Sequence, residues 1–214
     1  MKYSHVIFDL DGTLVDSASE IHEAAAEVCR EHELIIPSLD YIRSMSGSPP
    51  SLFFLDHGCV DSDVQELVVQ FRSYLATHAG DPSCVFDSVV PLLSWLKQRS
   101  IRISLATTKP TSLAAVLLNR YGLARFFCHI QGTDASMKPK PHPDILNACL
   151  EGGRCGSAVM IGDTIFDVEA ARNAAIDSIA VCTGAHDKDQ LANSNPTFLL
   201  RSLDGIYSVF DNLL

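Results

Sequence analysis

The sequence predicts an α/β fold in which a doubly wound parallel sheet carries an inserted block of helices. From residue 86 onward, apolar strand-like runs alternate with helical patterns, and this alternation is typical of crossover units in a parallel sheet. Residues 17–82 break the alternation, because they contain helical patterns and no convincing strand. With 214 residues, the chain is long enough for one full core and a small accessory domain.

The elements are expected in the following order. An apolar run at 5–9 predicts the first strand, and it is followed by helical patterns at 18–33 and 61–79 with two shorter ones between them. Four further strands are expected, at 101–107, 126–132, 157–163 and 178–184. Helices are expected between them, near 88–98, 111–121, 142–151 and 166–175. Several strands end in polar residues, and the crevice beyond the carboxyl ends of parallel strands is where such sheets bind ligands.

The helical block is predicted to form a cap domain over residues 17–82. The core domain would then comprise residues 1–16 and 83–214, with hinges near residues 15–17 and 80–83.

Composition excludes several classes of protein. The formal net charge is −10 and no basic cluster exceeds KQR at 97–99, so the phosphate backbone of a nucleic acid would be repelled. No apolar run approaches the roughly 20 residues that a membrane span needs. The seven cysteines are scattered and contain no CxxC pair, a pattern typical of reduced thiols. We therefore expect a cytoplasmic protein, either a monomer or a homodimer, without nucleic-acid or membrane partners.

The first strand ends in Asp9 and Asp11, which would share one face of an extended chain. Two like charges about 4 Å apart cost roughly 4 kcal/mol at an effective dielectric constant near 20. Magnesium would relieve this repulsion, because it prefers carboxylate oxygens together with phosphate and water. Gly12 and Thr13 then allow a tight turn whose N–H groups could face an anion.

The string FDLDGTLVDS resembles the first motif of the haloacid dehalogenase superfamily of phosphatases and phosphomutases. The resemblance covers essentially the whole chain, and it implies a Rossmann-like core with a helical cap inserted at this place. It also implies that Asp9 is the nucleophile that forms an aspartyl phosphate and that Asp11 is the general acid and base. The main-chain carbonyl of Asp11 would help to bind the metal.

The segment ISLATTKP ends the second core strand with two hydroxyl groups. By the same resemblance, Thr107 would bind a phosphoryl oxygen, and Thr108 occupies the next phosphate-binding position. Alternatively, these hydroxyl groups form a turn that caps the following helix. The two roles are compatible, so both can apply.

The segment SMKPKPHPDIL offers two lysines, and the family pattern KPxP selects Lys140. A lysine there can offset the repulsion between an anionic nucleophile and an anionic substrate. Lys138 is the alternative, since KPKP also begins at that residue.

The segment VMIGDTIFDVEAA ends the fourth core strand with Asp163, and Asp167 follows four residues later in the first turn of the next expected helix. The family motif GDxxxD implies that Asp163 is a side-chain ligand of Mg²⁺. Asp167 would either contact the metal through water or hold Lys140.

The cap segment MSGSPPSLFF contains a rigid turn that could point towards the site. Capped relatives use this loop to select the substrate, which implies that role for Gly47, Ser48 and Pro49. A plain interhelical turn remains the alternative.

Together these motifs predict a Mg²⁺-dependent phosphatase that hydrolyses a small phosphorylated metabolite and resembles phosphoglycolate phosphatases. A phosphomutase of the β-phosphoglucomutase type has the same core motifs, so only the cap or the products would distinguish it. A phospho-accepting signalling receiver also uses Asp, Thr, Lys and Mg²⁺. Receivers, however, have about half this length and lack the inserted cap.

Overall fold

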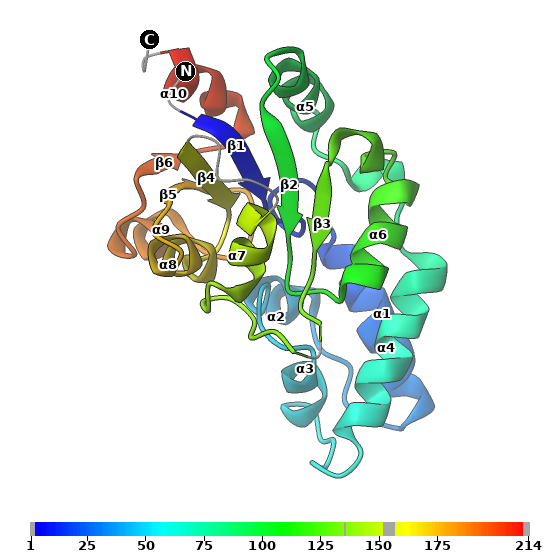
Figure 1. Cartoon of the computed structure of the whole chain (residues 1–214). Helices are drawn as coiled ribbons and strands as arrows, with labels where there is room; N and C mark the ends of the chain where they lie inside the picture. Colours follow the sequence, from blue (N-terminus) through cyan, green and yellow to red (C-terminus); the bar gives the residue numbers. More distant parts are fainter. Residues whose placement is uncertain (1–2, 135, 152–156, 212–214) are drawn as a thin grey trace.

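Six parallel strands form one sheet at the centre of the molecule (Figure 1). The computed structural model describes residues 3–134, 136–151 and 157–211. The strands are β1 (Tyr3–Phe8), β2 (Arg102–Ala106), β3 (His129–Gln131), β4 (Ser157–Gly162), β5 (Asp177–Val181) and β6 (Phe198–Leu200). Their order is β3-β2-β1-β4-β5-β6, so the direction of winding reverses between β1 and β4. The predicted doubly wound sheet is confirmed, and its reversal point is where ligands bind in such sheets.

Helices cover both faces of the sheet, and the alternation of side chains along β1 shows why. Val6 and Phe8 join a hydrophobic cluster with α5 (Val89–Gln98), α6 (Thr111–Arg120) and α10 (Ile206–Asp211). Ile7 points to the opposite face and packs with α7 (Asp144–Glu151) and α8 (Ile165–Asn173). A strand buried on both sides needs a nearly continuous apolar run, and VIF at 6–8 supplies it.

Four helices lie beyond the carboxyl ends of β1 and β2, in the lower part of Figure 1. They are α1 (Ala18–Glu31), α2 (Leu39–Ser44), α3 (Ser51–Leu55) and α4 (Val64–His78). The ring of Phe71 on α4 meets Phe53 and Phe54 of α3 edge-on, at centroid distances of 5.9 and 6.1 Å. These aromatic contacts give the helical block apolar packing of its own.

The two segments that connect the helical block to the sheet run side by side. The Asp16 N–H donates to the Cys84 carbonyl at 2.8 Å, and the Phe86 N–H donates to the Leu14 carbonyl at 3.2 Å. Both connections to the helical block therefore pass through the same place. The division into a core and a cap at 17–82 stays a prediction.

The ends of several strands differ from the prediction. The expected strand at 126–132 is reduced to β3, because Ala124–Phe126 forms a 3₁₀ turn. Thr107 and residues 182–184 fall outside the strands and belong to the loops that follow β2 and β5. The structure also adds α9 (Lys188–Asn193), the 3₁₀ helix Leu203–Gly205, β6 and α10, which the sequence analysis did not predict.

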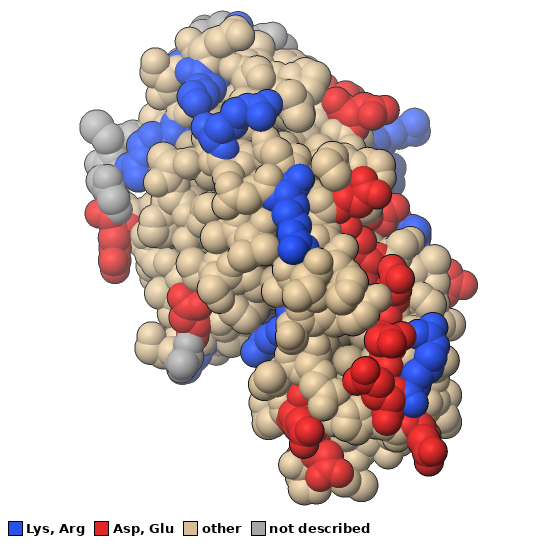
Figure 2. All heavy atoms as spheres, turned by 90° about the vertical axis from the view of Figure 1, so that its right-hand side faces the viewer, with Lys and Arg blue, Asp and Glu red and all other residues tan. Residues whose placement is uncertain are grey.

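On the side shown in Figure 2, acidic side chains form a band along the right that continues over the lower part of the face, while basic side chains gather at the top. Helix α1 alone carries four glutamates, at positions 20, 23, 27 and 31. Within the described part of the chain, no helix has the length and apolar character needed to cross a membrane.

Candidate active site

Loops from separate parts of the chain bring four buried polar side chains to the carboxyl edge of the sheet. Asp9 follows β1, Thr107 follows β2 and Asp163 follows β4, while Lys140 lies in the loop before α7. All four are at most 6% exposed. The N–H of Asp9 donates to the Ile161 carbonyl at 2.9 Å, which extends the pairing of β1 and β4 to the proposed nucleophile.

Lys140 is the centre of this group. Its Nζ lies 2.9 Å from Asp9 Oδ1 and 2.6 Å from Asp167 Oδ1, and it also donates to the Ala106 carbonyl at 3.2 Å. Burial by itself would lower the pKa of Lys140, but the carboxylates of Asp167 and Asp9 overcome this effect and hold the pKa above its usual range. Lys140 therefore stays charged.

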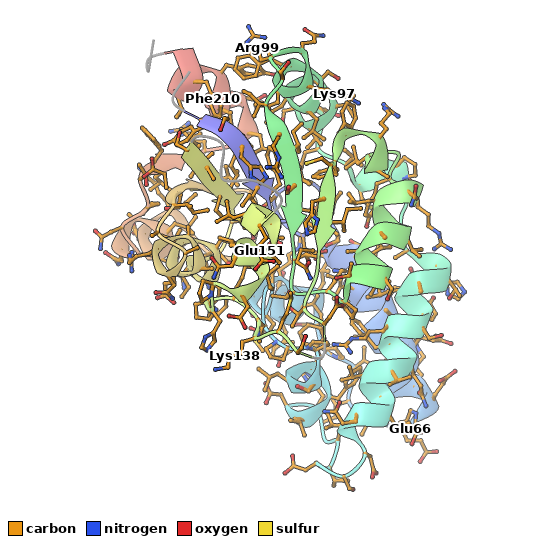
Figure 3. The ribbon with its side chains drawn as sticks, in the orientation of Figure 1. Glu66, Lys97, Arg99, Lys138, Glu151 and Phe210 are labelled. Atoms are coloured by element: carbon orange, nitrogen blue, oxygen red, sulfur yellow. The ribbon has the colours of Figure 1, made fainter. Side chains whose placement is uncertain are left out.

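Lys138 is placed differently. It is exposed on the loop before α7, on the outside of the molecule (Figure 3). Of the two lysines in the KPKP segment, the structure brings only Lys140 to the carboxylates.

Asp167 uses both of its carboxylate oxygens within the protein. Oδ1 contacts Lys140, while Oδ2 accepts hydrogen bonds from the Thr164 N–H at 3.0 Å and from the Thr164 hydroxyl at 2.6 Å. The contacts with Thr164 form a capping box at the start of α8. The sequence left two roles open for Asp167, a contact with the metal through water and a contact with Lys140. The structure shows the contact with Lys140.

Asp163 is completely buried and held from two sides. Its Oδ1 accepts from the Thr13 hydroxyl at 2.8 Å, and its Oδ2 accepts from the Ala185 N–H at 3.1 Å. A Cβ atom on Gly12 would lie 2.4 Å from Asp163 Oδ2, and one on Gly184 would lie only 1.8 Å from it. The two glycines are therefore required for this carboxylate to occupy its place.

The carboxylates of Asp9, Asp163 and Asp167 could hold a metal ion, because each offers an oxygen and these oxygens lie within 4.8 Å of one another. Burial raises the pKa of Asp9 to about 7, with Lys140 opposing the shift and Asp167 and Asp11 adding to it. Burial and the nearby Asp9 and Asp167 raise the pKa of Asp163 well above its usual value. Three buried carboxyl groups share the one ammonium group of Lys140, so they need a further positive charge to stay ionised. Mg²⁺ fits a site whose ligand atoms are all oxygens.

The side chain of Asp11 contacts two partners that the sequence analysis did not identify. Lys109 Nζ lies 2.5 Å from Asp11 Oδ2, and the Ser17 hydroxyl donates to Oδ1. Lys109 follows Thr107 and Thr108 in the same loop, and this position was the sequence signal that could have identified it as a site residue. Ser17 is the first residue beyond the crossing into the helical block, so Asp11 contacts both parts of the chain.

The two threonines after β2 occupy different environments. Thr107 is fully buried, its N–H donates to the Gln131 carbonyl at 3.0 Å, and its hydroxyl accepts from the Lys109 N–H at 3.3 Å. Thr108 is half-buried and lines a pocket beside Asp11. The hydroxyl proton of Thr107 has no acceptor within the described ranges, which leaves it available to a phosphoryl oxygen.

Comparison with known proteins identifies the family of this chain. The model of the haloacid dehalogenase-like hydrolase family matches residues 6–181, a range that contains every candidate residue named above. The chain belongs to this family. The resemblance predicted from the DLDGT, KPxP and GDxxxD motifs is thereby confirmed.

Relatives of this hydrolase include phosphoglycolate phosphatases. One from Pseudomonas savastanoi pv. phaseolicola is 31% identical over 209 residues, which cover 92% of the chain and 76% of the relative. One from Caulobacter vibrioides is 32% identical over 84% of the chain and 79% of the relative. The predicted enzyme class, a phosphatase similar to phosphoglycolate phosphatases, is therefore confirmed.

Solved structures show the same fold. A haloacid dehalogenase-like hydrolase from Streptococcus pneumoniae has a TM-score of 0.87 at 28% identity, covering 98% of this chain and 99% of that one. A β-phosphoglucomutase from Clostridium difficile has a TM-score of 0.78 at 18% identity, covering 99% of this chain and 98% of that one. The likeness to the mutase shows the fold alone.

A small pocket lies between the core of this hydrolase and its helical block. Asp11, Thr108 and Lys109 line it from the core, and Gly47, Ser48 and Pro50 line it from the loop before α3. Pro49, which the sequence analysis assigned to this loop surface, is exposed and does not line the pocket. Pro50, the residue that precedes α3, lines the pocket instead. The cavity measures about 60 Å³.

Proposed function

We propose that this hydrolase is a Mg²⁺-dependent phosphatase that hydrolyses a small phosphorylated metabolite through an aspartyl phosphate on Asp9. The observation that carries the proposal is the contact of buried Asp9 with Lys140, beside the carboxylate of Asp163. Mg²⁺ bound by Asp9, Asp163 and the main-chain carbonyl of Asp11 would neutralise negative charge on the nucleophile and the phosphoryl group. Asp167 would act on this site by holding Lys140.

The first half of the reaction forms the covalent intermediate. A carboxylate oxygen of Asp9 attacks phosphorus while the bond from phosphorus to the ester oxygen breaks, and Asp11 gives a proton to the departing alcohol. Lys140 offsets the repulsion between the anionic nucleophile and the anionic substrate. The hydroxyls of Thr107 and Thr108 would donate to phosphoryl oxygens.

The second half releases phosphate. Asp11, now ionised, takes a proton from water as the water oxygen attacks phosphorus, and the Asp9 carboxylate leaves. The contacts of Asp11 with Lys109 and Ser17 support this role, because they hold its carboxylate at the border of the pocket.

The size of the pocket supports a small substrate. The cavity beside Asp11 measures about 60 Å³, which favours a small leaving group over a large one. The phosphoglycolate phosphatase relatives act on such an ester, and we propose the same class of substrate here. A cytoplasmic location is also proposed, since the six described cysteines are all free thiols.

A phosphate-release screen with purified protein tests the proposal. Phosphoglycolate, hexose phosphates, nucleoside monophosphates, pyridoxal phosphate and pyrophosphate would each be supplied with Mg²⁺ or with excess chelator. We expect phosphate release from at least one small ester with Mg²⁺ and none with chelator. Full activity in chelator would contradict the metal requirement, and an isomerised sugar phosphate without phosphate release would indicate a mutase.

A further inference from the structure

Arg72 is a cation in the pocket without an acid to pair with. It lies on α4, directly after Phe71, and it lines the pocket between the helical block and the core. Burial lowers the pKa of Arg72, and its side chain is only partly exposed. Across residues 3–134, 136–151 and 157–211, no carboxylate forms an ion pair with it. A half-buried guanidinium without a counter-ion is costly, so a ligand that supplies an anion would be favoured.

The pocket as a whole has an excess of positive charge. Its charged lining consists of Arg72, Lys109 and Asp11, so two cations face one carboxylate. Lys109 and Asp11 already form an ion pair at 2.5 Å, which leaves the charge of Arg72 unbalanced. Most of the remaining wall is apolar and includes Phe53 and Leu113. Charge–charge interactions are stronger beside apolar walls than in water.

We propose that Arg72 binds a carboxylate carried by the alcohol part of the substrate, and thereby selects phosphate esters of small hydroxy acids. The proposal rests on the proposed function, because Asp11 on the same pocket wall is the group that would protonate the departing alcohol oxygen. That oxygen and the carboxylate must therefore lie close together in the substrate. Lys109 is the second cation within the same pocket.

A carboxylate fits the pocket better than a second phosphate group. The cavity measures about 60 Å³, and a planar carboxylate is smaller than a tetrahedral phosphate. A guanidinium also matches a carboxylate through two parallel N–H···O bonds. Arg72 comes from α4 and Asp11 from the core, so a ligand bound between them would join the two parts of the molecule.

The test compares two esters that differ in one group. Phosphoglycolate carries a carboxylate where 2-hydroxyethyl phosphate carries a neutral hydroxymethyl group. We expect the wild-type protein to prefer phosphoglycolate by about 10- to 100-fold in kcat/KM, the range expected for hydrogen bonds to a charged group. Arg72→Met should abolish most of this preference, mainly by raising KM for phosphoglycolate, while Arg72→Lys should retain part of it.

Arg30→Met is the matched control. Arg30 is also a cap arginine, but it is exposed on α1 and pairs with Glu27. Its replacement removes the same charge from the helical block without altering the pocket, so the preference should not change. An equal loss of preference in both variants would show a general electrostatic effect and would overturn the proposal.

Binding provides a readout that does not depend on turnover. Calorimetry on Asp9→Asn, with Mg²⁺ present, should show phosphoglycolate binding about 10-fold or more tightly than 2-hydroxyethyl phosphate. Asp9→Asn combined with Arg72→Met should bind both esters alike. If both esters bind the single variant equally, the role of Arg72 is refuted even when the enzyme proves to be a phosphatase. If the wild type releases no phosphate from any ester, the proposed function fails instead.

Discussion

Lys140 Nζ lies 2.9 Å from Asp9 Oδ1, which makes a buried ammonium the direct counter-charge of the proposed nucleophile. The same ammonium is shared with Asp167, at 2.6 Å. One positive charge thus serves two buried carboxylates. Its loss should affect both the stability of the fold and the chemistry of the site.

We predict that Lys140→Met lowers the free energy of unfolding by about 3–5 kcal/mol, because it leaves two buried carboxylates without their partner. Phosphate release should fall to background. Urea unfolding and a phosphate assay measure the two effects. Lys138→Met is the control, since Lys138 is exposed two residues away, and it should change stability by less than about 0.5 kcal/mol. Equal effects of the two substitutions would contradict the assignment of Lys140.

The close approach of Gly184 to Asp163 gives a second prediction. In Gly184→Ala the new Cβ would lie 1.8 Å from Asp163 Oδ2, so the carboxylate must move away from its place beside Asp9. We expect the Mg²⁺ concentration for half-maximal rate to rise at least about tenfold, with a loss of stability of about 1–3 kcal/mol. A Mg²⁺ titration of the rate measures the shift.

Gly205→Ala serves as the comparison for this variant. A Cβ at Gly205 would meet only the side chain of Leu200, at 3.1 Å, and it lies outside the carboxylate cluster. Its Mg²⁺ requirement should match the wild type. An unchanged requirement in Gly184→Ala would show that Asp163 does not need its present position to bind the metal.

The raised pKa values of Asp9 and Asp163 predict how stability depends on pH without metal. A carboxyl group with a raised pKa binds its proton more tightly in the folded state than in the unfolded state. For Asp9, the free energy of unfolding therefore falls as pH rises from the ordinary value of 3.8 to about 7. Bound Mg²⁺ favours the ionised carboxylates and should oppose this loss.

Thermal unfolding in chelator and in Mg²⁺ measures this effect. We expect Mg²⁺ to raise Tm more at about pH 7.5 than at about pH 5, since the carboxylates carry more charge at the higher pH. Asp163→Asn should reduce the difference, because the amide does not titrate. A larger gain in Tm at the lower pH would refute the idea that metal binding replaces protons on these acids.

The pocket between the helical block and the core predicts a limit on substrate size. We expect a three-carbon phosphate ester to have a specificity constant at least about 100-fold higher than that of a folded phosphoprotein, because closure over the site excludes large groups. Steady-state kinetics on both substrates tests this limit. Comparable specificity constants would show that residues 17–82 do not restrict access.

Much of the fold could be predicted from the sequence because the central strands are buried on both faces. Strands β1, β4 and β5 contain apolar runs that a solvated segment would not need. Strand β6 was missed for the opposite reason, since its three residues lie at the edge of the sheet and are only partly buried. Such a short run has no periodicity to recognise.

The candidate site could be predicted where a sequence motif determines the backbone position of a residue. It was harder to predict where a contact depends on the conformation of a long side chain. Asp9, Lys140 and Asp163 meet because strand ends and loops of the sheet carry them to one edge. The ion pair between Lys109 and Asp11 depends instead on the conformation of the long Lys109 side chain. Arg72 was missed because an arginine on an amphipathic helix ordinarily faces water, and only the packing of α4 near the core brings it to the pocket.

The central claim is that Asp9 carries the phosphoryl group. The most direct measurement is a rapid acid quench of Asp11→Asn with acetyl phosphate and Mg²⁺, followed by borohydride reduction and peptide mass mapping. Acetyl phosphate has a leaving group that needs little protonation, whereas hydrolysis of the intermediate still needs the base. We predict that Asp9 alone is reduced to homoserine, and that Asp9→Asn gives neither this product nor steady-state phosphate release while staying folded. Phosphoryl transfer to another residue, or turnover near the wild-type rate in Asp9→Asn, would contradict it.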